Sequence, residues 1–400
     1  MSKKQETALV PFGASVPKSG YWKRVSNAYL FVFRALLFVL PLFVIVFMAI
    51  CAQAFTKNSV FGFGNDLLSV SSFLSSDYQT VYYTYEPGEK EVLSYRDGVA
   101  VVTTQGIEVY SPDGERLLNK SMSFTTPRAV ASAKYLVAFD FGTTSFVITN
   151  GYTVLFEGNT EFPILGANVA DTGHFALITA SDTHLSQVLL YDANFNLVQR
   201  FSRSSATTDV CISSNGKYVA FCALTSENGG SQSIVELYRI GAKKPAFSKK
   251  CEGLAMALSF TDTSALALVT ARAGYVLDLD GDQQAFLDFG GNSLVSYDIN
   301  ENGCVFLLDT DSVHPESRVL ACDKEGVLLC DQVLNADLFD VAMGAKQVLL
   351  LGNESLWRVE TEKGGTDTLA VQAGASGILL TDEGQLRLVY AGAAEYVKFD

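Results

Sequence analysis

From Tyr78 onward, short apolar runs alternate with turns of glycine, aspartate and asparagine, about every 8 to 12 residues. This part of the chain shows almost no helical period. The clearest unit joins DVCISSNGKYVAFCAL (209–224) to SIVELYRIGAKKPAFSKK (233–250), and its upstream neighbour joins GANVADTGHFALITA (166–180) to QVLLYDANFNLVQRF (187–201). Each unit predicts four strands, which indicates an all-β repeat.

Fainter copies of this unit recur from about residue 92 to the end, with a period of about 30 to 47 residues. A repeat of four strands in about 40 residues is the signature of a β-propeller blade, because a lone sheet cannot bury both of its faces. The count predicts eight blades. Seven is the alternative, because the last copy is short and closure could borrow a strand near residues 81–85. The predicted second strands centre on Val101, Val137, Leu177, Ala220, Leu268, Phe306, Leu349 and Leu379.

Two β-sandwich domains would also give short strands with regular turns. Approximate copies that follow one another without a proline-, glycine- or serine-rich linker favour a single ring.

The N-terminal part has a different pattern. Residues 35–52 (ALLFVLPLFVIVFMAICA) form an uncharged run of 18 residues, and roughly 20 helical residues span a bilayer. We therefore predict one transmembrane helix over 27–55, a signal anchor that contacts the lipid bilayer, with Pro41 tolerated inside it. The predicted organisation is a basic tail (1–26), this anchor, a juxtamembrane linker (56–77) and a propeller (78–400).

Charge predicts the orientation of the anchor. The first 34 residues contain six basic residues and one acidic residue, whereas the whole chain carries −14, so the remainder carries −19. The positive-inside rule places the N-terminus in the cytosol and the propeller outside the cell membrane. The sequence Ala52-Gln53-Ala54 resembles a signal-peptidase site, so cleavage after Ala54 is the alternative. An acidic body repels phosphate backbones, which argues against nucleic acid as a partner.

Six of the seven cysteines lie beyond the anchor. Cys211 and Cys222 flank one turn, and Cys322 and Cys330 flank another, so each pair could face across a hairpin. An extracytoplasmic location permits disulfides, but cysteine is also a common buried apolar residue. The sequence leaves both readings open.

No catalytic or metal-binding constellation is apparent, and the catalytic residues remain unknown. The chain has three histidines, His174, His184 and His314, and it lacks H-E-x-x-H, C-x-x-C and G-x-S-x-G motifs. We expect these histidines at rims or in loops. No metal or cofactor is expected.

The run of Asp278, Asp280 and Asp282 resembles half of a calcium loop. It lacks the glutamate of an EF-hand, and Asp-Gly favours a type I′ hairpin turn.

The turn Ser214-Asn215-Gly216-Lys217, followed by Tyr218-Val219-Ala220-Phe221 and a later Tyr-Arg strand, resembles WD40-like and quinoprotein-like propellers. The whole layout, over residues 20–400, is similar to an uncharacterised family of membrane-anchored propeller proteins of Gram-positive bacteria. Quinoprotein enzymes have tryptophan-rich blades, whereas Trp357 is the one tryptophan of the predicted propeller. The resemblance therefore implies the fold and no pyrroloquinoline quinone.

Together these features predict a non-enzymatic scaffold at the cell envelope that binds a protein, a peptide or another ligand. The alternative is an extracytoplasmic hydrolase that acts on a glycan or lactone with axial carboxylates. A third hypothesis is a sensor whose basic tail (Lys3, Lys4, Lys18, Lys23 and Arg24) contacts cytosolic partners, although topology alone explains these residues.

Overall fold

The structure is a computed structural model. It describes residues 78–84, 88–227, 230–310, 313–362, 364–381 and 384–399, together with 27, 29–34, 36, 37 and 39. The predicted tail (1–26), the linker (56–77) and most of the predicted anchor (27–55) lie outside the described residues. The chain divides into two compact units, Met1–Phe63 and Gly64–Asp400, which are described separately.

In the first unit, all the described residues are helical, and their large apolar side chains are exposed. Tyr29 is 79% exposed and Phe31 is 74% exposed. Within the stretch that the structure describes, no helix has the length and apolar character needed to cross a membrane. The transmembrane helix stays a prediction.

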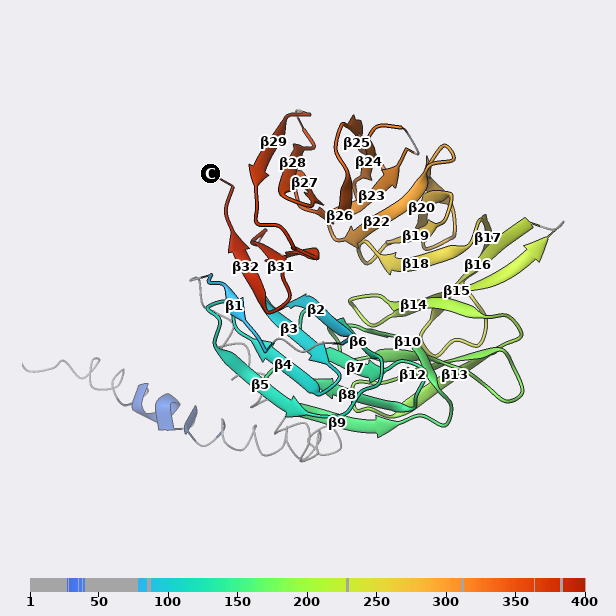
Figure 1. Ribbon diagram of the computed structural model, residues 1–400. Helices are drawn as coiled ribbons and strands as arrows, with labels where there is room; N and C mark the ends of the chain where they lie inside the picture. Colours follow the sequence, from blue (N-terminus) through green and yellow to red (C-terminus); the bar gives the residue numbers. More distant parts are fainter. Residues whose placement is uncertain are drawn as a thin grey trace, which may run out of the picture. The chain divides into compact units, whose positions relative to one another are not determined.

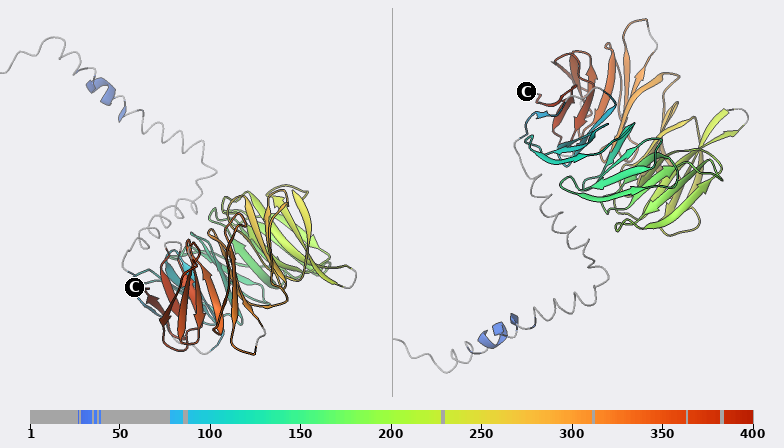
Figure 2. Two further views of the ribbon diagram at one scale, coloured as in Figure 1. Left: turned by 90° about the horizontal axis from the view of Figure 1, so that it is seen from above. Right: turned by 60° about the horizontal axis from the view of Figure 1, so that its bottom comes forward.

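The second unit is an all-β propeller of eight four-stranded antiparallel sheets (Figures 1 and 2). In seven sheets the strands follow chain order from the innermost to the outermost. Blades 1 to 4 contain β2 (Lys90–Tyr95), β3 (Gly98–Thr103), β4 (Gly106–Tyr110), β5 (Arg116–Ser121); β6 (Pro127–Ala131), β7 (Leu136–Asp140), β8 (Ser145–Thr149), β9 (Val154–Asn159); β10 (Ile164–Val169), β11 (Phe175–Thr179), β12 (Ser186–Tyr191), β13 (Leu197–Arg203); and β14 (Thr207–Ile212), β15 (Tyr218–Glu227), β16 (Gly230–Arg239), β17 (Phe247–Glu252). Blades 5 to 8 contain β18 (Ala255–Phe260), β19 (Ala265–Thr270), β20 (Ala273–Asp278), β21 (Gln283–Asp288); β22 (Ser293–Asn300), β23 (Gly303–Asp309), β24 (Ser317–Cys322), β25 (Leu328–Leu334); β26 (Leu338–Met343), β27 (Gln347–Gly352), β28 (Ser355–Glu360), β29 (Thr366–Ala370); and β30 (Gly377–Leu380), β31 (Leu386–Val389), β32 (Ala393–Val397) with β1 (Val81–Tyr82).

Burial follows the position of a strand within its blade. The second strands are continuous apolar runs, and every residue of β3 and β19 is buried because a blade packs against each of their faces. The outermost strands face solvent and are more polar, as in β5 (RLLNKS). The core is therefore a series of apolar clusters between neighbouring blades, such as the cluster that Leu268 and Tyr275 of blade 5 form with Ala220 and Leu237 of blade 4.

The ring closes by pairing strands from opposite ends of the chain. β1 pairs with β32 through Val81 with Ala394 and Tyr82 with Ala393, so blade 8 takes its outermost strand from the N-terminal side of the ring (Figure 1). Val81 and Ala394 are fully buried in a cluster with Val99 and Val101 of blade 1. Eight blades are confirmed, and the seven-blade alternative is wrong.

This closure changes one predicted strand. Seven of the eight predicted second strands occupy that place, but Leu379 lies in β30, the innermost strand of blade 8. The prediction at Leu379 was wrong because blade 8 has only three strands of its own in sequence order, and the fourth comes from β1.

The structure also decides the two possible hairpin disulfides. All six cysteines of the propeller are buried free thiols. Cys211 lies opposite Ala220, not opposite Cys222. Cys322 and Cys330 belong to apolar clusters on opposite faces of blade 6, so their side chains point apart. Neither suggested pair is bridged.

Candidate functional site at the axis of the propeller

The innermost strands surround the axis of the propeller, because each contacts its counterparts in both neighbouring blades. Five of them, β10, β14, β18, β22 and β26, change register near their first residues. Such a β-bulge bends the strand and increases its twist. The bulged residues are Leu165, Thr208, Met256, Val295 and Phe339.

Polar side chains on the innermost strands join successive blades. In five junctions a carboxylate or amide oxygen accepts a hydrogen bond from a backbone N–H of the next blade. The pairs are Glu91 with Ala129 (3.2 Å), Asn168 with Ile212 (3.0 Å), Asp209 with Leu258 (2.8 Å), Asp298 with Met343 (2.8 Å) and Asp340 with Ile378 (2.8 Å).

The remaining three junctions use other contacts. The N–H of Ala133 donates to Asp171 between blades 2 and 3 (2.8 Å), and Lys324 lies 3.8 Å from Asp262 between blades 5 and 6. Blades 8 and 1 are joined by Arg387, which donates to the carbonyl oxygens of Asp97 and Pro112, each at 2.8 Å. Every junction of the ring therefore contains a polar contact.

Two of the inner carboxylates have strongly shifted pKa values. Burial raises the pKa of Asp209 to about 6, and the backbone N–H groups of Leu258 and Val210 oppose this shift. Burial also raises the pKa of Asp298 to about 6, with a further upward contribution from the charge of Asp340. Protein surrounds both side chains on nearly all sides, yet each residue keeps some accessible surface.

The end of the axis where the innermost strands finish is hollowed. One depression of about 330 Å³ lies over the ends of β22, β26 and β30 and reaches Ser94 of blade 1. A second, of about 440 Å³, lies over the corresponding ends in blades 2 to 5. Asn300 and Glu301 border both. Together the depressions draw on all eight blades, and we call them the axial depression.

The charged residues that line the described part of the axial depression are all acidic. They are Asp171, Asp262, Asp298, Glu301 and Asp340. Asp298 and Asp340 are partly buried and bind backbone N–H groups, whereas Glu301 is exposed in the two-residue turn between β22 and β23. The depression therefore favours cationic groups.

The opposite end of the innermost strands carries exposed apolar side chains as well as charged ones, such as Arg128 and Glu89. Four bulged side chains remain exposed there: Leu165 (38%), Met256 (47%), Val295 (43%) and Phe339 (38%). Since the neighbouring blades and the second strand cover the other sides of an innermost strand, this exposure lies towards the axis. These four side chains give that end a partly apolar surface.

The three histidines lie in separate places. His174 lies in the turn before β11, where its Nδ1 is 3.0 Å from Thr172 Oγ1. His184 lies in the loop between β11 and β12 at the other end of the blade, with Nδ1 2.8 Å from Thr183 Oγ1. His314 is exposed in the loop between β23 and β24. No group of three or more histidine, cysteine or acidic residues is placed to hold a metal ion among the residues that the structure describes.

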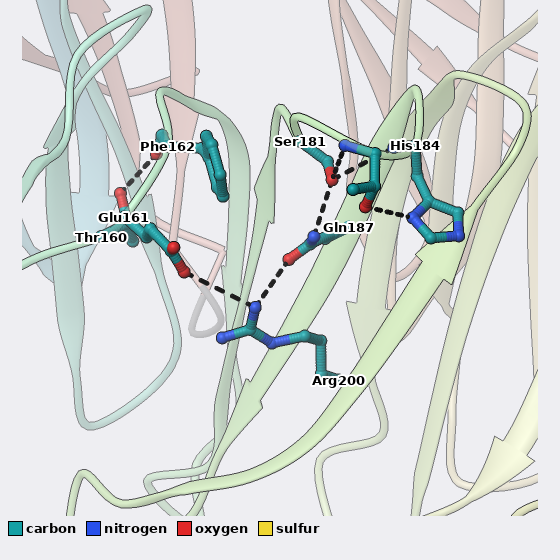
Figure 3. A network of polar contacts seen from close by, with 8 residues as sticks. Thr160, Glu161, Phe162, Ser181, His184, Gln187 and Arg200 are labelled. Atoms are coloured by element: carbon teal, nitrogen blue, oxygen red, sulfur yellow. Dashed lines mark hydrogen bonds and ion pairs between the residues drawn. The ribbon is translucent and has the colours of Figure 1, made fainter.

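The surroundings of His184 form a polar surface network (Figure 3). Ser181 accepts hydrogen bonds from the His184 N–H (3.3 Å) and from Gln187 Nε2 (2.8 Å). Arg200 donates to Gln187 Oε1 (3.2 Å) and lies 3.7 Å from Glu161, so it links blade 3 to the segment that follows blade 2. Both charged side chains are well exposed, and such pairs contribute little free energy. The network orders the loop between β11 and β12.

The aspartates that resemble a calcium loop form a hairpin turn. Asp278 Oδ1 accepts the N–H groups of Asp280 (2.9 Å) and Asp282 (2.8 Å), and Gly281 has a φ of +84°. The prediction of a type I′ turn is wrong. That turn needs a positive φ at both central residues, and Asp280 does not have a positive φ. The register shift before Leu277 instead indicates a type I turn with a bulge. Asp192 and Asp323 accept the equivalent N–H groups in blades 3 and 6.

This geometry predicts a purely structural role for Asp278. Asp278→Ala should lower the free energy of unfolding by about 1 kcal/mol, because it removes the acceptor for two backbone N–H groups. Asp280→Ala is the control and should change it by less than about 0.5 kcal/mol, as its side chain is exposed. Urea unfolding measures both values. A Ca²⁺-dependent rise in stability that both variants lose would instead indicate a calcium site.

Trp357 lies away from the axial depression. Its Nε1 donates to Ser355 Oγ (3.0 Å), and its ring packs against the apolar cluster between blades 6 and 7. It therefore fills the core between blades.

Comparisons with known proteins agree with this architecture. No relative among curated proteins matches the sequence. The fold is similar to that of Sqt1 from Chaetomium thermophilum, solved bound to the N-terminus of the ribosomal protein L10 (TM-score 0.53, 12% identity, 81% of this chain and 100% of that chain). It is also similar to BamB from Moraxella catarrhalis (0.52, 11%, 80% and 97%) and to a eukaryotic initiation factor (0.51, 12%, 82% and 89%). At these identities the similarity concerns the fold alone.

The sequence profile of one family matches residues 72–367, which include the first six blades in full and most of the seventh. Since this match covers well over half of the chain, the protein belongs to the DUF5711 family of unknown function.

Proposed function

We propose that this protein is a membrane-tethered, extracytoplasmic scaffold whose axial depression binds an extended basic segment of another envelope protein. The proposal rests mainly on the composition of that depression. All eight blades contribute to it, and the charged side chains among its described lining residues are all acidic. A partner with lysine or arginine side chains would meet complementary charge there.

Two further observations support this function. The chain beyond residue 34 carries −19, which attracts a cationic segment over a distance at low salt. The similar propeller Sqt1 was solved bound to the N-terminus of another protein, so a propeller of this kind can hold a terminal segment. The extracytoplasmic location and the tether rest on the basic tail and the apolar run of the sequence.

The alternative function is a hydrolase that uses axial carboxylates. One observation favours it, since Asp298 lines the axial depression and has a pKa raised to about 6, as a general acid requires. However, Asp298 Oδ2 accepts hydrogen bonds from the Met343 N–H and Asn300 Nδ2. Asp340 accepts from Ser296 Oγ and the Ile378 N–H. These contacts explain both carboxylates as structural links, so the scaffold is the better supported function.

Charge reversal at Glu301 tests the scaffold. A fluorescent decapeptide of alternating lysine and alanine should bind the full-length protein in detergent, and Glu301→Lys should weaken this binding about fivefold. Glu354→Lys is the matched control. It reverses an exposed charge in the turn between β27 and β28, at the opposite end of the strands, and should bind like the wild type. Fluorescence anisotropy at low and high salt measures the affinities.

Two outcomes would contradict the proposal. One is equal loss of affinity in both variants, which would indicate attraction by net charge alone. The other is equally tight binding of a decapeptide in which glutamate replaces lysine.

A further inference from the structure

Two cysteines of blade 6 face each other directly. The register of β23 and β24 pairs Cys304 with Cys322, so their side chains point to the same face of the sheet. Both lie in the apolar cluster between blades 5 and 6, with exposed fractions of 1% and 0%. Among the other described cysteines, none has a cysteine as its opposite residue; Cys211 faces Ala220, and Cys330 faces Ala321.

The backbone beside this pair has a conformation that requires glycine. A Cβ atom on Gly303, the residue before Cys304, would lie 2.1 Å from the carbonyl oxygen of Cys322. Only glycine tolerates that approach and the φ of +136° at this position. Directly opposed residues of an antiparallel pair have Cβ atoms about 4.5 to 5.5 Å apart, and a disulfide needs about 3.5 to 4.5 Å. A small further approach would therefore allow a bond.

The two thiols are also chemically unequal. In the folded state a hydrogen bond between the two side chains raises the pKa of Cys304 and lowers that of Cys322. Thiol–disulfide exchange begins with attack by a thiolate. Either cysteine can supply this thiolate while blades 5 and 6 are still unpacked.

We propose that Cys304 and Cys322 are a redox-modification site that forms a cross-strand disulfide when the chain folds in the presence of a small-molecule disulfide. One of the two cysteine thiols ionises and attacks the oxidant, which forms a mixed disulfide and releases one thiolate. The other cysteine then loses its proton to solvent, and its thiolate attacks the protein sulfur of the mixed disulfide. This releases the second thiolate, which takes up a proton. The two protein thiols lose two electrons and two protons, and the oxidant is reduced to two thiols.

Because both sulfurs are buried in the folded protein, the reaction has to occur during folding. The folded propeller covers both sulfurs with residues of blade 5, such as Val269 and Phe289, so the exchange takes place before blades 5 and 6 pack. The bond would join the two central strands of the blade and close the loop between them, which restricts the unfolded chain. This inference does not depend on the function of the axial depression.

Oxidative refolding of the full-length chain tests the site. The protein is unfolded, refolded in detergent with a mixture of oxidised and reduced glutathione, and alkylated under denaturing conditions. We expect free thiols to fall from the seven of the sequence to five. Peptide mapping should find one linked pair, Cys304 with Cys322, and the thermal midpoint should rise by several degrees relative to the reduced protein.

Two variants act as controls. Cys304→Ser should keep the remaining six thiols free, whereas Cys330→Ser removes another buried thiol of blade 6 and should still form the bond. The mapping of the wild type does not depend on whether either variant folds. Seven free thiols after oxidative refolding, or a bond between any other pair, would overturn the proposal.

Discussion

Arg387→Met should lower the free energy of unfolding by about 3 kcal/mol, because it removes the donors for two carbonyl oxygens, one in a buried and one in a partly buried contact. Arg387 is 1% exposed and lies on β31. Its two terminal nitrogens donate to Asp97 and Pro112 of blade 1, and its guanidinium lies 5.5 Å from the ring centre of Tyr78. Methionine fills similar space, so the loss reports mainly on the polar contacts. Urea unfolding of the full-length protein in detergent measures it.

Two nitrogens of the guanidinium donate in this contact, whereas lysine has a single side-chain nitrogen. Arg387→Lys should therefore be more stable than Arg387→Met but less stable than the wild type. Arg239→Met is the matched control, since Arg239 is exposed on β16, and it should change stability by less than about 0.5 kcal/mol. If Arg387 closes the ring, the amides of Val81 and Tyr82 should also exchange hydrogen faster in Arg387→Met. Unchanged stability together with unchanged exchange would show that the ring closes without this arginine.

The second large effect is a fall in stability as the pH rises from about 4 to about 7. Asp209 and Asp298 have pKa values of about 6 in the folded protein, above the 3.8 of an unperturbed aspartate, so the folded state holds these protons more tightly than the unfolded state. Their contribution is fully present below about pH 4 and is lost as the pH passes through 6. Each carboxylate should account for about 2 kcal/mol of this loss.

Thermal midpoints between pH 4 and pH 7.5 measure this dependence. Asp209→Asn and Asp298→Asn should each flatten the curve, and the double variant should flatten it further, because an asparagine keeps one acceptor oxygen without a titrating proton. Glu354→Gln is the control at an exposed carboxylate and should follow the wild type. A steep fall between pH 4 and 7 that persists in the double variant would assign it to other groups.

These two predictions depend on contacts that sequence reasoning missed. The sequence contains 43 acidic residues, which were too many for us to identify the few on the innermost strands that bind the next blade. One signal was present, since Glu91, Asp209, Asp298 and Asp340 all lie in the first strand of a repeat unit. A polar side chain in the same strand of several repeat units that are otherwise apolar indicates a shared structural contact.

The repeat itself was predictable because its causes are local. Alternating and continuous apolar runs determine strands, and turns such as Ser214-Asn215-Gly216-Lys217 determine where they end. Seven of the eight second strands follow from this pattern alone. The eighth did not, because blade 8 takes its outermost strand from β1, through a contact across the whole length of the domain.

The sequence by itself determined an all-β chain of repeated four-stranded units, since each strand and turn depends on residues close to it. Tertiary structure decided which residues meet across blades. Asp209 and Leu258 are 49 residues apart, and Arg387 and Asp97 are 290 apart. It also decided that Cys304, and not Cys330, lies opposite Cys322. Such contacts depend on strand register and on closure of the ring, which no local pattern specifies.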